Sequence, residues 1–162
     1  MVAVTSSRTA VVTLPTDTQI LITRDFNAPR HLVYKAWTTP ELITRWWSGD
    51  RDEVTSVEVD LRVGGKWRYV MTAIGGFEVA FHGEYREIVT NERIVSTEVF
   101  EGMPDAEAVD TVTFAEQDGR TTVTVLVQHA DKTLRDRHID SGMEDGLQEA
   151  MNHLEQVAVS LR

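Results

Sequence analysis

Apolar and polar residues alternate with a period of two over the middle of the chain, from Val54 to Ala130. Val57, Val59 and Leu61, for example, are separated by acidic residues. This alternation is typical of strands with one covered face and one face in water. We therefore expect a run of about six strands, joined by short turns, that builds an antiparallel sheet. The segment Gln19–Phe26 predicts an earlier strand.

Two short helices are predicted directly after that earlier strand. The first covers His31–Trp37, with Asn27 as its cap. Pro40 ends this helix and starts the second, which is expected to run through Trp47 with Thr39 as cap. Neither helix is long enough to be stable alone, so both must dock on an apolar surface.

A long helix is predicted at the C-terminus. Apolar residues recur there at steps of three and four from Met143 to Leu161, so they share one face of a helix about 20 residues long. Ser141 and Glu144 have the spacing of a capping box. The order of elements favours an α+β fold, in which a curved antiparallel sheet wraps around this helix.

The length of 162 residues indicates one domain, which we place at residues 19–162. Residues 1–18 are expected to be an N-terminal tail, with a short extra strand at Thr9–Leu14. This N-terminal segment lacks the basic start and apolar stretch of a signal peptide, and no apolar run is long enough to span a bilayer. A cytoplasmic location is therefore expected.

The charge balance excludes several partners. The chain has 16 Lys and Arg against 26 Asp and Glu, a formal net charge of −10. This acidity argues against nucleic acids and anionic membrane surfaces. The absence of cysteine excludes disulfides and thiolate metal sites. The histidines show no metal-binding spacing, and neither a metal nor a cofactor is expected.

The aromatic residues on the predicted strands occupy alternate positions, so their side chains lie on the same face of the sheet. Trp67, Tyr69, Phe81 and Tyr85 should all face the long helix. They form either a filled core or the wall of a mostly apolar pocket, with methionines as adaptable lining. The predicted ligand-binding residues are Trp37, Trp46, Trp47, Trp67, Tyr69, Met71, Phe81, Tyr85, Phe100, Met143, Leu147 and Met151.

Two polar residues are candidates for proton transfer in such a pocket. His129 has the inward parity of its strand, and Glu98 is the next polar group that could point inward. A histidine at a strand end is more often simply hydrogen-bonded at the rim. No two histidines have the sequence spacing of metal ligands, and His138 is placed in a loop.

Several segments together resemble a known family. Asn27-Ala28-Pro29, Ala36-Trp37-Thr38, Asp60–Trp67 and Phe81–Tyr85 are similar to the signature of the Hsp90-ATPase-activator-like (AHSA1) proteins, within the START/Bet v 1-like superfamily (SRPBCC). The resemblance covers roughly Gln19 to Leu161 and implies the helix-grip fold. Many members have Gly-Trp where this chain has Gly146-Leu147, and the smaller Leu147 side chain should enlarge the space beneath the helix.

Three functions stay open on these grounds. The first is the binding of a small hydrophobic or aromatic ligand between the sheet and the C-terminal helix. The second is a polyketide cyclase- or hydrolase-like activity on such a ligand, and the third is a chaperone-associated interaction module, as in Hsp90 ATPase activation. A homodimer is an open option for the oligomeric state.

Overall fold

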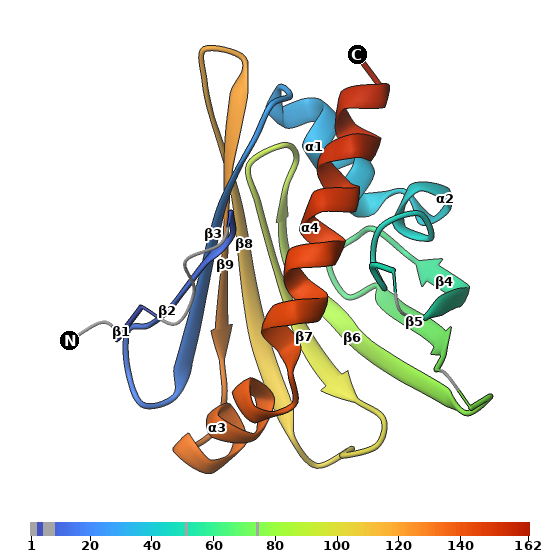
Figure 1. Ribbon diagram of the computed structural model, residues 1–162, viewed down its shortest axis with the longest axis vertical. Coiled ribbons are helices and arrows are strands. Elements are labelled where there is room, and N and C mark those ends of the chain that lie inside the picture. The colour runs from blue at the N-terminus through green and yellow to red at the C-terminus, as the bar shows by residue number, and fades with distance from the viewer. Residues whose placement is uncertain (1–2, 5–8, 51, 74) are drawn as a thin grey trace.

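The strands of the computed structural model form one antiparallel sheet (Figure 1). The structure describes residues 3–4, 9–50, 52–73 and 75–162. Within these residues the sheet has nine strands in the order β1-β2-β3-β9-β8-β7-β6-β5-β4. Their bounds are β1 Ala3–Val4, β2 Val11–Leu14, β3 Gln19–Phe26, β4 Glu53–Val59, β5 Lys66–Thr72, β6 Glu78–Val89, β7 Arg93–Phe100, β8 Glu107–Gln117 and β9 Arg120–Gln128.

Helix α4 (Met143–Ser160) lies along the concave face of this curved sheet (Figure 1). Helices α1 (Arg30–Thr38) and α2 (Pro40–Ile43) follow β3, and α3 (Lys132–Asp140) connects β9 to α4. This arrangement confirms the predicted α+β, helix-grip fold. None of the helices among the described residues is long and apolar enough to cross a membrane.

The core lies between α4, α1 and the strands around β9. The β9 residues Val123, Val125 and Val127 are buried on one face, as the alternating pattern predicts. On α4 the buried positions include Met151, Leu154 and Ala158, which are three or four residues apart. Burying a side chain such as Leu154 contributes about 1.5–3 kcal/mol, so this stripe supplies much of the free energy that docks α4.

Polar contacts at the β2–β3 side of the sheet hold α4 in place. The buried Arg24 guanidinium donates to the Met151 carbonyl oxygen and, over 3.2 Å, to Asn152 Oδ1. Gln148 Nε2 donates to the Ala10 carbonyl oxygen over 2.7 Å, and its Oε1 accepts from the Ala10 N–H over 3.1 Å. These bonds fix the helix at one edge of the sheet.

The ends of the first two helices differ from the prediction. Pro29, not Asn27, is the N-cap of α1 and offers no capping side chain, while the Asn27 N–H donates to Glu155 Oε2 over 3.0 Å. Helix α2 stops at Ile43 instead of Trp47, and the chain continues as turns to Asp50. Thr39 occupies the α2 N-cap without a side-chain bond.

The predicted capping box of the long helix is also wrong. Gly142 is the α4 N-cap, in the left-handed region with φ 84° that glycine adopts at low cost. Ser141 instead ends α3, a helix that the hydrophobic pattern did not predict. His138 therefore lies on a helix and not in a loop.

Strand β2 pairs with β3, and β1 pairs with β2 in turn. Of the predicted tail, residues 1–2 and 5–8 lie outside the described residues. The connection between β7 and β8 is short, since β7 ends at Phe100 and β8 begins at Glu107.

Candidate functional site

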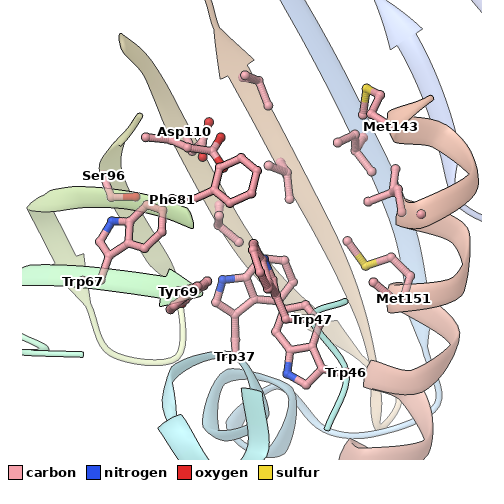
Figure 2. Close-up of a pocket in the computed structure, with 18 of the residues that line it drawn as sticks. Trp37, Trp46, Trp47, Trp67, Tyr69, Phe81, Ser96, Asp110, Met143 and Met151 are labelled. Atoms are coloured by element: carbon pink, nitrogen blue, oxygen red, sulfur yellow. The ribbon is translucent and has the colours of Figure 1, made fainter. Parts of the chain in front are cut away.

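A cavity of about 400 Å³ lies between the sheet, the N-terminal half of α4 and the α1–α2 segment (Figure 2). Its wall is mostly apolar. The curved sheet and α4 diverge at this end of the molecule, and the side chains do not fill the space between them. The volume falls within the range of about 300–1,000 Å³ that is typical of pockets for small molecules.

The strands β5 and β6 supply the aromatic part of the wall. Tyr69 and Phe81 are register partners on these strands, and the Tyr69 and Trp67 rings lie 4.8 Å apart between centroids. The α1–α2 segment adds Trp47, which makes edge-on contacts with Tyr69 at 5.1 Å and Phe81 at 5.3 Å. Edge-to-face contacts of this kind stabilise aromatic clusters beyond simple burial.

Gly83 makes room for the Trp67 indole. A Cβ built at Gly83 would lie 2.5 Å from Trp67 Nε1 and 1.8 Å from the Thr97 carbonyl oxygen. Only glycine therefore allows β6 to approach β7 this closely while the indole lies over it. The Trp67 side chain is 7% exposed, and its Nε1–H has no hydrogen-bond partner.

Trp37 and Trp46 hold the α1–α2 segment against the cavity. Their ring centroids are 5.2 Å apart, and the Trp46 Nε1–H donates to the Ala36 carbonyl oxygen over 2.9 Å. This bond satisfies the indole N–H of the buried Trp46 and fixes the turn that follows α2. Trp47, next in the chain, is thereby directed toward Tyr69 (Figure 2).

The face of α4 that looks into the cavity carries small and flexible side chains. These residues follow the helical spacing of three and four, so one stripe of the helix lines the cavity. They are Met143, Gly146, Leu147, Ala150 and Met151.

A pair of carboxyl groups interrupts the apolar wall. Glu98 on β7 and Asp110 on β8 both line the cavity, and their side chains are hydrogen-bonded to each other. Because two carboxylates cannot bond without a proton, the pair holds one proton between its two groups. Burial raises the pKa of Glu98, and burial together with the neighbouring Glu98 raises that of Asp110 well above its usual range.

A pair of histidines lies at the α3 end of the cavity. His138 lines the cavity, and its Nδ1 is 3.0 Å from Nε2 of His129. Burial, and to a lesser extent the neighbouring His129, lowers the pKa of His138 to about 4. The imidazole is therefore neutral near pH 7 and can exchange hydrogen bonds with a bound molecule.

The structure brings nearly all the predicted ligand-binding residues to this one cavity. The exception is Phe100, which does not line it. Phe100 is 38% exposed at the end of β7, where its ring packs on the outer side of Phe81 at 5.2 Å. Residues that do line the cavity are Trp37, Trp46, Trp47, Trp67, Tyr69, Met71, Phe81, Tyr85, Met143, Leu147 and Met151.

Of the two candidates for proton transfer, Glu98 lines the cavity and His129 does not. His129 lies behind His138, and the two imidazoles are hydrogen-bonded to each other. Sequence reasoning missed Asp110 and His138. Asp110 occupies alternate positions with Val112 and Phe114, and this pattern could have placed it on the inward face of its strand. His138 could not be placed in this way, because helix α3 was not predicted.

No metal centre accompanies these groups. Among residues 3–4, 9–50, 52–73 and 75–162, no cluster of three or more histidine or acidic side chains has the geometry to hold a metal ion. The cavity wall among these residues also contains no lysine or arginine.

Comparisons with known proteins identify a family. The sequence profile described as "Activator of Hsp90 ATPase homolog 1-like protein" (AHSA1) matches residues 27–158. No curated protein matches the chain in sequence.

Solved structures share the fold. A Rhodobacter sphaeroides protein superimposes with a TM-score of 0.86 at 23% identity, over 93% of this chain and 98% of its own. A Nitrosomonas europaea protein gives 0.82 at 22% identity, over 91% and 97%. A Mycobacterium smegmatis protein gives 0.81 at 25% identity, over 96% of each chain.

Proposed function

Since the chain belongs to the family of Activator of Hsp90 ATPase homolog 1-like proteins, we propose that it binds a small hydrophobic or aromatic molecule in the cavity between the sheet and α4. The observation that carries this proposal is the cavity itself. Its volume of about 400 Å³ and its mostly apolar wall are typical of a site for a small molecule.

The composition of the wall supports a ligand with a flat apolar body. Trp47, Tyr69 and Phe81 present ring edges and faces on one side, and the methionines Met143 and Met151 face them from α4 (Figure 2). Aromatic rings hold flat molecules through stacking and edge contacts. Methionine adapts to the outline of different ligands because its side chain is unbranched and polarizable.

The other two functions predicted from the sequence stay predictions. A polyketide cyclase- or hydrolase-like activity would use the same cavity, with Glu98, Asp110 or His138 as proton-transfer groups. A chaperone-associated role would use the outer surface and does not require a cavity. Neither follows from the cavity alone, so binding is the function that the geometry supports best.

A tryptophan on the cavity stripe of α4 tests the proposal. Leu147→Trp places an indole in the cavity, and Val159→Trp places the same indole at a position of α4 that is 39% exposed and outside the cavity. We would titrate both variants and the unchanged protein with ethylnaphthalene, a neutral aromatic hydrocarbon, by isothermal titration calorimetry. Circular dichroism melting curves would establish that both variants are folded.

We expect saturable binding to the unchanged protein and to Val159→Trp. Leu147→Trp should bind about tenfold more weakly or worse, because the indole occupies part of the volume that the ligand needs. The proposal is wrong if the unchanged protein shows no saturable binding, or if the folded Leu147→Trp variant binds as tightly as Val159→Trp.

A further inference from the structure

The Glu98–Asp110 pair leaves an uncompensated negative charge in the cavity. With one proton shared between them, the two carboxyl groups carry a single negative charge once the remaining acidic site of the pair is ionised. Among the residues that the structure describes, no lysine, arginine or histidine forms an ion pair with either group. Buried charges are ordinarily paired or ligate a metal, and this one has no such partner among the described residues.

The other titratable groups in the wall do not balance this charge. Asp52 is acidic, and His138 is neutral because burial lowers its pKa to about 4. Tyr69 and Tyr85 are neutral as well, because burial raises the pKa of both phenols. Across the described residues, the wall therefore offers negative charge and no positive charge to a bound molecule.

Two buried polar atoms of the cavity wall lack hydrogen-bond partners. Trp67 Nε1 is a donor without an acceptor, and Asp110 Oδ1 has no donor apart from the proton that its carboxyl group shares with Glu98. The Trp67 side chain is more than nine-tenths buried, and its indole nitrogen lies on the side of the ring toward Ser96 (Figure 2). Native interiors leave few polar atoms in this state. Both atoms are shielded from the cavity by neighbouring atoms, so a ligand would reach them only if these side chains turned.

Aromatic rings surround the rest of the same cavity. Trp47 is in contact with both Tyr69 and Phe81, and Trp67 is in contact with Tyr69. The faces of such rings carry partial negative charge and attract cations within about 6 Å, most strongly when water is excluded. The aromatic wall and the carboxyl pair thus favour the same sign of charge in the ligand.

We infer that the ligand is an organic cation, with an aromatic body in the tryptophan-lined part of the cavity and a protonated amine held by Glu98 and Asp110. This inference rests on the proposed binding function and specifies its ligand class. An ammonium group supplies donors to the carboxyl oxygens and cancels their net charge.

Anionic ligands are disfavoured by the same carboxyl pair. A fatty acid or an aromatic carboxylate would place a second negative charge beside the carboxyl pair in an apolar cavity, where like charges repel strongly. Neutral hydrocarbons can enter, but they leave the carboxyl pair without a partner.

A matched set of probes tests the inference. Naphthylmethylamine is protonated at neutral pH and has the same shape as ethylnaphthalene, which is uncharged. We would measure the ratio of their affinities by calorimetry for the unchanged protein, for Asp110→Asn and for the double variant Glu98→Gln/Asp110→Asn. Naphthylacetate serves as the anionic probe.

The unchanged protein should bind the amine about tenfold or more tightly than ethylnaphthalene, and naphthylacetate most weakly. Asp110→Asn should keep a preference for the amine, because Glu98 then carries the single negative charge alone. In the double variant, whose two amides are uncharged, the affinity ratio should fall to about one.

Equal affinities of the unchanged protein for the amine and the hydrocarbon would overturn the inference while the binding function stands. A folded double variant that keeps the full preference for the amine would overturn it too. If neither probe binds, the proposed binding function fails, and the inference fails with it.

Discussion

Glu98 and Asp110 show how two carboxyl groups can be accommodated inside an apolar cavity. Each group alone would lose its hydration on burial, and two ionised groups side by side would also repel each other. The shared proton removes one of the two charges. It leaves the other without a counterion among the described residues, which is why the pair is the most distinctive chemical feature of the cavity.

The pH dependence of stability tests the shared proton. The pKa of each carboxyl is raised in the folded protein, so the folded state holds protons that the unfolded state releases. The pair therefore contributes stability below the raised pKa values, and this contribution is lost as the pH rises through them. Glu98→Gln/Asp110→Asn does not titrate and should be more stable than the unchanged protein at about pH 8, by about 1–3 kcal/mol.

The measurement is urea unfolding of both proteins between about pH 5 and pH 8. The difference in the free energy of unfolding should shrink toward pH 5. A difference that does not change with pH would show that the pair titrates normally in the folded protein.

The sequence predicted the face of the sheet on which a side chain lies wherever the alternation along the strand decides it. Trp67, Tyr69 and Phe81 face the cavity as the alternating pattern predicts. Phe100 has the same parity as Glu98 but lies at the last position of β7, beyond the cavity, and packs on Phe81 and Gly102. The alternation along a strand predicts the face on which a side chain lies. The extent of the cavity depends instead on where α4 and the α1–α2 segment cover that face.

At the scale of whole elements, the strong periodic patterns predicted the strands and the long helix. Helix α3 was missed because its sequence from Lys132 to Asp140 contains little apolar surface. It is held instead by polar contacts: the Asp131 side chain caps it through the Leu134 N–H at 2.8 Å, and Arg135 Nη1 donates to the Thr16 carbonyl oxygen at 2.7 Å. The Asp131 cap is a local signal, but the bond between Arg135 and Thr16 joins residues 119 apart in the chain and cannot be seen in a local pattern.

Two glycines on cavity elements should respond oppositely to the same substitution. Gly83→Ala in β6 puts a Cβ 1.8 Å from the Thr97 carbonyl oxygen, so the strands must separate and the Trp67 indole must move. We expect a loss of about 3 kcal/mol or more. In α4, Gly146→Ala meets no atom within 4 Å and should stabilise the protein by about 0.5–1 kcal/mol, since alanine favours the helix.

Chemical denaturation of the two variants and the unchanged protein measures the change in the free energy of unfolding for each substitution. Each variant is the control for the other. A Gly83→Ala variant as stable as the unchanged protein would contradict the close approach of β6 and β7 on which the Trp67 side of the cavity depends.

In the molecule as a whole, the way α4 is attached explains why the cavity exists. Arg24 and Gln148 tie the helix to the β2–β3 side of the sheet, while the strands β5 and β6 curve away on the other side. The apolar stripe from Met151 to Ala158 packs against the core, and the stripe from Met143 to Met151 faces the cavity. One helix thus serves both to stabilise the fold and to line the site.

The sequence predicted this sheet-and-helix architecture, but it could not decide between a filled core and a pocket. The same aromatic and methionine side chains are compatible with both. The outcome depends on how α4 sits over the sheet, and the bonds of Arg24 and Gln148 that hold it join residues far apart in the chain.

The central claim is that an aromatic molecule enters the cavity, and methionine methyl groups report on this most directly. Nuclear magnetic resonance of the protein with isotope-labelled methionine methyl groups would follow a titration with ethylnaphthalene. Met71, Met143 and Met151 line the cavity, whereas Met103 lies in the turn between β7 and β8 and serves as the internal control.

We predict that the signals of Met71, Met143 and Met151 shift along one saturable curve while the Met103 signal stays in place. Signals from the three cavity methionines that do not move, or that move no more than the signal of Met103, would contradict the account.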